Sequence, residues 1–281
     1  MEQDRDKARS FFHSLREREG AAADFVDLQE ALFRFRGEEM EREDLSGQFA
    51  APRVDEQALG RGKCLASQVS LIPPSKFLHQ SFRHLLDVLA AQSKLPASFR
   101  DWAEGAAQAN GLLEDWLRAA SESNALLLTN LAQESGQDEE LLRWVGRELA
   151  KPFFHRSGRA LSQQHLSAWH RGECPCCGGF PRMARLEKET GRRHLWCDLC
   201  NVEWPFARLP CPFCGNDDTE KLGFLEIEGQ DTYRITVCKA CKGYLRTIDE
   251  RHLPEGVFAD MVLEDVAAFP LDFVARLEEY R

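Results

Sequence analysis

The sequence predicts an α+β protein in which an all-helical N-terminal domain precedes two small four-cysteine β modules and a short C-terminal helical tail. Two observations lead to this prediction. Apolar residues recur at helical spacing between about residues 21 and 170, and four Cys-x-x-Cys pairs crowd into roughly the last 110 residues. The predicted segments are a mobile N-terminal tail (1–20), the helical domain (21–170), a first module (171–207), a second module (208–250) and the C-terminal helical tail (251–281).

The N-terminal domain is predicted from its helical periodicity and from the near absence of alternating strand patterns. A helical domain of about 150 residues is large enough to bury a core of its own. The apolar stripes include Phe82, Leu85, Leu86 and Leu89, then Trp102, Leu113, Trp116 and Leu117, then Leu142, Val145 and Leu149.

Eight of the ten cysteines form the four Cys-x-x-Cys pairs Cys174/Cys177, Cys197/Cys200, Cys211/Cys214 and Cys238/Cys241. Two such pairs on facing turns make one tetrahedral cage of four sulfur atoms, so the eight cysteines predict two bound metal ions. The first and third pairs share the longer form Cys-Pro-x-Cys-Gly, which marks an internal repeat.

The lengths of the spacers indicate which pairs share an ion. Nineteen residues separate the first pair from the second and twenty-three separate the third from the fourth, which is enough for a β-hairpin in each case. Only ten residues, including Pro205 and Pro210, separate the second pair from the third, and we interpret them as a connector. Sequential pairing is therefore favoured over an interleaved cross-brace.

The turn residues are compatible with metal binding. Pro175 and Pro212 restrict the backbone inside their turns, and Gly178 and Gly215 can adopt the positive φ that lets backbone amides point at thiolate sulfur. Cys176 lies between two ligands, and using it instead would lose the match between the first and third pairs. We predict that it is a spare thiol beside the site. Cys64 is isolated in the sequence, so we expect it to pack as a small apolar side chain.

A disulfide framework is the main alternative for so many cysteines. The charged first twenty residues lack the apolar segment of a signal peptide, and no apolar run is long enough to span a bilayer. These features predict a cytoplasmic protein without membrane insertion. Reducing conditions in the cytoplasm keep thiols free and favour metal ligation over disulfides.

Composition weighs against nucleic-acid binding and catalysis. The chain has 36 Lys+Arg against 46 Asp+Glu, and residues 171–281 alone have 15 against 20, whereas non-specific nucleic-acid affinity requires a basic face. Four cysteines close the coordination shell of an ion, and no phosphate-binding loop or nucleophile motif is present. We therefore predict no enzymatic activity and no nucleic-acid partner, and a zinc-ribbon nucleic-acid-binding protein stays an alternative.

The four cysteine motifs, read with their flanking residues, are similar to those of a known family. The segments are CPCCGGFP (174–181), CDLCNVEW (197–204), RLPCPFCG (208–215) and CKACKGY (238–244). Together they resemble the formate dehydrogenase accessory proteins, the FdhE family, and the similarity extends into the tail, from 258–261 to 270–272. The resemblance implies a helical N-terminal domain followed by two rubredoxin-like, or zinc-ribbon-like, modules.

This resemblance implies an assembly role rather than catalysis. Family members are cytoplasmic, chaperone-like accessory proteins that are needed for active respiratory formate dehydrogenase, so the implied partner is the catalytic subunit of that enzyme. Self-association is left open. The implied ligands are Cys174, Cys177, Cys197 and Cys200 for one ion, and Cys211, Cys214, Cys238 and Cys241 for the other.

The metal itself is not fixed by four sulfur ligands, since such cages accept zinc or iron. The family sites resemble rubredoxin, so we favour iron, and zinc also fits. Redox-active iron would allow a second function, a rubredoxin-like electron relay to the same client.

Overall fold

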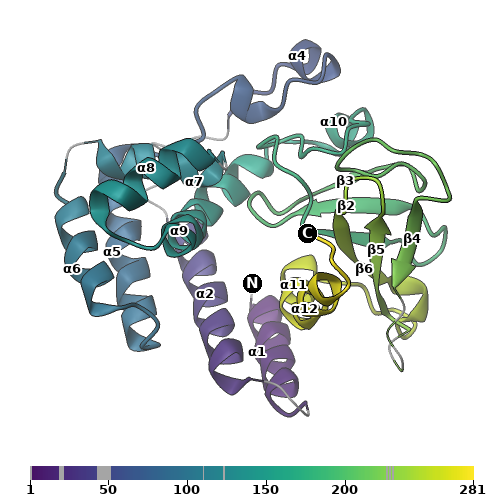
Figure 1. The fold of residues 1–281 in the computed structure, drawn as a ribbon, viewed down its shortest axis with the longest axis horizontal. Coiled ribbons are helices and arrows are strands. Elements are labelled where there is room, and N and C mark those ends of the chain that lie inside the picture. The colour runs from purple at the N-terminus through teal and green to yellow at the C-terminus, as the bar shows by residue number, and fades with distance from the viewer. Residues whose placement is uncertain are drawn as a thin grey trace. The chain divides into compact units, whose positions relative to one another are not determined.

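The computed structural model describes residues 2–18, 22–42, 52–109, 111–122, 124–225, 227, 229 and 231–281 (Figure 1). The chain divides into two compact units. The first consists of Met1–Pro52 and Ser70–Ser157, and the second consists of Arg53–Val69 and Gly158–Arg281. The second unit therefore includes a segment, 53–69, that the sequence analysis assigned to the helical domain.

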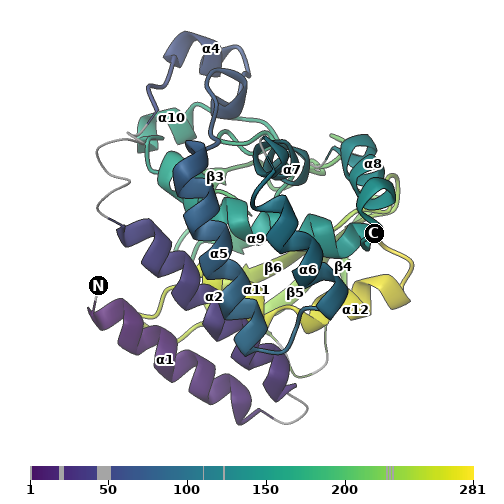
Figure 2. The ribbon, with the colours of Figure 1, turned by 90° about the vertical axis from the view of Figure 1, so that its left-hand side faces the viewer.

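The first unit is helical, as predicted. Its helices are α1 (Glu2–Arg16), α2 (Ala23–Glu41), α5 (Ser75–Ala91), α6 (Ala97–Ala106), α7 (Leu112–Ser121), α8 (Ala125–Ser135) and α9 (Glu139–Gly158), the last ending at the unit boundary. Figure 2 shows α2 beside both α1 and α5. Trp116 lies in the core. Its ring packs in a T-shaped arrangement with that of Phe82, with the ring centroids 5.5 Å apart, and its Nε1 donates a hydrogen bond to the carbonyl of Leu142 at 2.9 Å.

Helix α1 differs from the expected mobile tail over residues 1–20. Ala8, Phe12 and Leu15 recur at helical spacing and are buried, and α1 packs along α2. Arg16 at its end pairs with Asp27 at 2.7 Å and also with Glu30. The charged composition of this segment concealed a narrow apolar stripe, which is enough to hold a helix against a neighbour.

The second unit is built on a sheet of six strands. They are β1 (Met183–Leu186), β2 (Arg193–Cys197), β3 (Val202–Pro205), β4 (Leu222–Leu225), β5 (Tyr233–Cys238) and β6 (Tyr244–Asp249). The strand order is β3-β2-β1-β6-β5-β4, and all neighbours are antiparallel except β1 and β6. Both predicted hairpins are present, as β1–β2 and β4–β5. The two cysteine modules are not separate sheets, because the parallel β1–β6 pair joins them.

The C-terminal helices cover one face of this sheet (Figure 1). Helices α11 (Met261–Ala267) and α12 (Pro270–Leu277) contribute Met261, Leu271 and Ala275 to a buried cluster with side chains from β1, β2, β5 and β6. The short elements of the unit are α4 (Glu56–Gly60), η1 (Leu65–Ser67), α10 (Gln163–Ser167) and η2 (Glu250–His252).

A buried ionic cluster fixes α12 to β6. Asp272 accepts hydrogen bonds from Arg182 at 2.8 Å and Tyr244 at 3.0 Å, and its carboxylate lies 3.1 Å from Nε of Arg246. Arg246 also pairs with Asp265. Since Arg246 and Asp272 are only 1% and 4% exposed, each charge depends on its partners for compensation.

Candidate metal centres

All four Cys-x-x-Cys turns share one backbone geometry. The residue that follows the second cysteine has a positive φ, and its N–H donates to the carbonyl of the first cysteine at 2.8–2.9 Å. These residues are Gly178 (φ 77°), Asn201 (φ 49°), Gly215 (φ 71°) and Lys242 (φ 62°). The two glycines were predicted from sequence. Asparagine is common in this left-handed region, whereas lysine is not and gave no signal there.

The structure brings the first predicted set of four cysteines together. Cys174 and Cys177 lie before β1, Cys197 ends β2, and Cys200 lies in the turn to β3. Their sulfur atoms lie within 4.8 Å of one another, and Cys177 Sγ is 3.6 Å from Cys197 Sγ. This site is enclosed, since three of its cysteines are buried and the fourth is half-buried.

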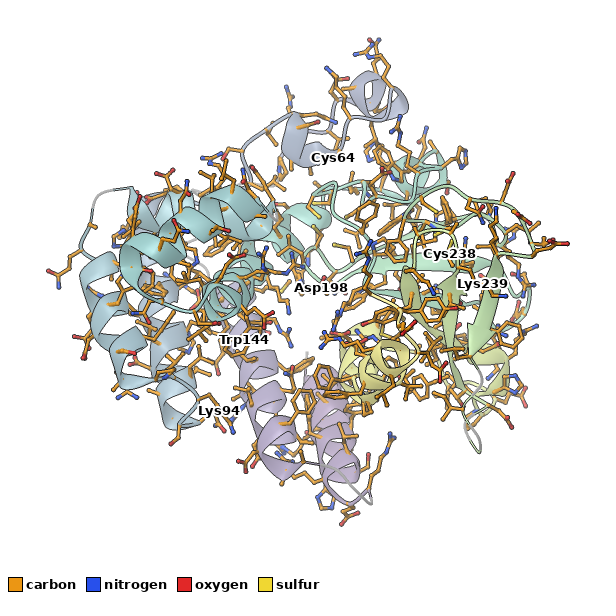
Figure 3. The ribbon with its side chains drawn as sticks, viewed as in Figure 1. Cys64, Lys94, Trp144, Asp198, Cys238 and Lys239 are labelled. Atoms are coloured by element: carbon orange, nitrogen blue, oxygen red, sulfur yellow. The ribbon has the colours of Figure 1, made fainter. Side chains whose placement is uncertain are left out.

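The second set repeats this arrangement in the other half of the sheet. Cys211 and Cys214 precede β4, Cys238 ends β5, and Cys241 lies in the turn to β6. Cys211 Sγ lies 3.8 Å from Cys241 Sγ, and Cys214 Sγ lies 3.8 Å from Cys238 Sγ. Cys214 is exposed, so this site is more open to solvent than the first. Figure 3 labels Cys238 at the end of its strand.

The sulfur spacings fit a tetrahedral ion. A metal–sulfur bond of about 2.3 Å places tetrahedral sulfur atoms about 3.8 Å apart, which matches the three spacings of 3.6–3.8 Å. Backbone amides also point at the sulfur atoms: the N–H of Gly179 donates to Cys177 at 3.4 Å, and that of Gly243 donates to Cys241 at 3.3 Å. Such donors offset the negative charge of a tetrathiolate site.

Without an ion, the buried cysteines cannot all be thiolates. Burial raises the pKa of Cys174 and Cys200 well above the usual value, whereas hydrogen bonds from neighbouring thiols, Cys174 first, lower the pKa of Cys177. At the second site burial raises the pKa of Cys211 to about 12. A bound ion must therefore displace protons, and metal affinity should fall as the pH falls.

The two remaining cysteines both lie beside the first site. Cys176 is fully buried and is not in the group of four, and its role as a spare thiol stays a prediction. Cys64 is isolated in the sequence but lies against the first cysteine turn. Its sulfur is 3.1 Å from the position that a Cβ atom on Gly178 would occupy. The backbone N–H groups of Leu65 and Ala66 donate to the carbonyls of Pro175 and Cys176 at 2.9 and 2.8 Å, which explains why 53–69 belongs to this unit. Figure 3 labels Cys64 on that segment.

Comparison with known proteins identifies the cysteine region. The sequence model of the family "FdhE, central domain" matches residues 173–208. A "Protein FdhE homolog" from Aquifex aeolicus is 30% identical over 146 residues, which are 51% of this chain and 50% of that protein. Another from Pseudomonas aeruginosa is 34% identical over 108 residues, 35% of this chain and 33% of that protein.

The chain is thus similar to FdhE proteins over a third to a half of its length, and the match to the family's sequence model lies in the cysteine region. Its fold resembles that of the FdhE protein from Pseudomonas aeruginosa, whose crystal structure aligns with 99% of this chain and 93% of that one, with a TM-score of 0.63 and 20% identity. The chain spans about half the length of the Aquifex relative that it matches.

Proposed function

We propose that this FdhE-type accessory protein binds the catalytic subunit of a formate dehydrogenase in the cytoplasm and assists its maturation, with two structural tetrathiolate ions. The observation that supports the proposal is the combination of similarity to FdhE proteins with two complete four-cysteine groups. Both groups lie in the turns of one sheet, so each ion would link the two Cys-x-x-Cys turns of its group. No described helix has the length and apolar composition needed to cross a membrane.

The client is tested by affinity capture of the tagged full chain from cells grown on formate or nitrate, followed by mass spectrometry. We expect the formate dehydrogenase catalytic subunit among the captured proteins and reduced enzyme activity when the gene is deleted. Cys238→Ser should reduce both capture and activity, and Cys176→Ser is the matched control because that thiol is not in a group of four. Full enzyme activity in the deletion strain would contradict the proposal.

The proposed ions are held by the eight cysteines, with iron favoured. An iron(III) tetrathiolate absorbs visible light and bleaches on reduction, whereas zinc does neither. Elemental analysis of protein purified from its own host, combined with the visible spectrum, distinguishes the two metals. Fewer than two equivalents of any metal per chain would contradict the ligand assignment.

The second candidate function, electron transfer to the same client, is favoured by one observation. Cys214 of the second site is exposed, so an iron ion there would lie near the surface, where electrons can reach it. The test mixes the reduced iron form with oxidised client and follows recovery of the visible band. A site that stays reduced in the presence of client would exclude the relay.

A further inference from the structure

A cleft lies on the sheet face opposite α11 and α12, next to the second four-cysteine site. It encloses about 340 Å³. Thr236, Leu245 and Thr247 line it. Along β5 and β6 these residues alternate with residues of the buried cluster that packs against α11 and α12, so the cleft opens on the opposite face of the sheet. Cys211 and Cys238 line one side, and the residues that decide its chemistry are Arg193, Arg208, Leu209, Phe213, Phe224 and Arg234.

The cleft is positively charged in an acidic protein. Among the described residues that line it there are three arginines and no aspartate or glutamate, although the chain has 46 acidic residues against 36 basic ones. Arg234 is compensated by Asp249 at 3.0 Å, and its guanidinium lies 5.5 Å from the ring centre of Phe224. Arg193 and Arg208 therefore carry the excess charge.

Arg193 is a buried cation without a carboxylate partner in the described part of the chain. It is 5% exposed, its Nη2 donates to the carbonyls of Ala207 and of Pro210, the latter at 2.6 Å, and its guanidinium lies 5.0 Å from the ring centre of Phe206. Its Nε is buried and has no hydrogen-bond acceptor among the described residues. Burial lowers the pKa of Arg193 to about 10, so the side chain stays charged at neutral pH. A buried charge in this state is costly unless an anion accompanies it.

The metal site explains only part of this arrangement. Four thiolates around a divalent ion leave a net charge of about minus two, which would attract the nearby arginines. However, no cysteine sulfur accepts a hydrogen bond from Nε of Arg193, so the cage leaves that donor unsatisfied. Arg208 is exposed and has no hydrogen-bond or ion-pair partner in the described chain, so its guanidinium is available to a ligand.

We propose that this cleft binds a small organic anion, with Arg193 and Arg208 holding a phosphate or carboxylate group and the apolar wall holding the rest of the ligand. Guanidinium groups match the geometry of both kinds of oxyanion. Leu209 and Phe224 are 60% and 54% exposed and, with Phe213, supply the apolar wall. A volume of about 340 Å³ is at the small end of ligand sites, which suits one ring or short chain with its acidic group.

The test is calorimetric titration of the metal-loaded full chain with phenyl phosphate, benzoate, inorganic phosphate and phenol. We expect saturable one-to-one binding of phenyl phosphate or benzoate, weaker binding of inorganic phosphate, and none of phenol. The tighter of the first two probes identifies the acidic group. Arg208→Gln should weaken binding about tenfold, the loss expected for one charge-assisted hydrogen bond. Arg192→Gln is the matched control, since Arg192 is the exposed neighbour of Arg193 and does not line the cleft.

A second measurement needs no variant and so does not depend on folding. Phenyl phosphate should slow the modification of Arg208 by an arginine-specific dicarbonyl reagent, measured by peptide mass spectrometry, and should leave Arg192 unaffected. The proposal is wrong if no probe binds saturably or if Arg192→Gln weakens binding as much as Arg208→Gln does. It is also wrong if Arg208→Gln lowers the metal content while anion binding is unchanged, because the arginine would then serve the cage alone.

Discussion

The ionic cluster around Asp272 allows a quantitative test of how the C-terminal helices are held to the sheet. Replacing Asp272 with alanine removes the acceptor for Arg182 and Tyr244 and leaves Arg246, which is 1% exposed, with Asp265 as its remaining carboxylate. Breaking a buried ion pair by removing one partner costs about 3–5 kcal/mol. Since each 1.4 kcal/mol is tenfold, 3 kcal/mol corresponds to a change of more than a hundredfold in the opening equilibrium.

Hydrogen exchange followed by mass spectrometry measures this opening in the sheet separately from the helical unit. We expect the amides of β5 and β6 to exchange more than a hundredfold faster in Asp272→Ala, whereas those of α5 and α7 should be unchanged. Glu278→Ala is the control, because Glu278 is an exposed residue just after the same helix and should change exchange little. An increase below tenfold in Asp272→Ala would refute the reasoning, since it would mean that solvent compensates Arg246.

Three further predictions follow from the sites. Cys241→Ser should lose one equivalent of metal and make the remaining ion easier to remove with a chelator, whereas Cys176→Ser should keep both ions; elemental analysis measures both. In the unmodified chain a chelator should empty the second site first, because Cys214 is exposed, and native mass spectrometry with differential alkylation of the cysteines tests the order. Burial, and then the charge of Asp272, raises the pKa of Tyr244 in the folded protein. The neutral phenol of Tyr244 therefore stabilises the fold below the unfolded pKa of about 10, and this stabilisation is lost as the pH rises through the pKa of the folded state. Between pH 9 and pH 11 the urea midpoint of unfolding should therefore fall less steeply with pH for Tyr244→Phe than for the unmodified chain.

The local features of the cysteine region could be predicted from sequence because short-range signals determine them. The Cys-x-x-Cys spacing located the turns, and the lengths of the spacers between the pairs predicted both hairpins correctly. Strand β6 was missed because its buried positions include Arg246, Thr247 and Asp249, which do not look like a half-buried strand. The carboxylates that compensate Arg246 lie on α11 and α12.

The cleft and the place of segment 53–69 in the second unit could not be predicted from sequence, because both depend on contacts that form only in the fold. Arg193 looks like one more surface arginine in the run Gly191-Arg192-Arg193, and only its place at the start of β2 buries it. The hydrogen bonds of Leu65 and Ala66 to the first cysteine turn link residues more than a hundred positions apart, so no periodic pattern could reveal them. Contacts of that separation depend on the fold rather than on the local sequence.

The position of β6 determines how the two metal sites depend on each other. The second site combines the cysteine turn before β4 with the turn between β5 and β6, and β6 begins just after its last cysteine, so an ion bound there would order the start of β6. The same strand pairs in parallel with β1, whose start follows the first cysteine turn. Unlike separate zinc ribbons, the two four-cysteine groups therefore share a sheet, and losing an ion from the second group would remove support from the strand that adjoins the first. This coupling is the reason that one cysteine substitution is expected to weaken both sites, although it removes a ligand from only one.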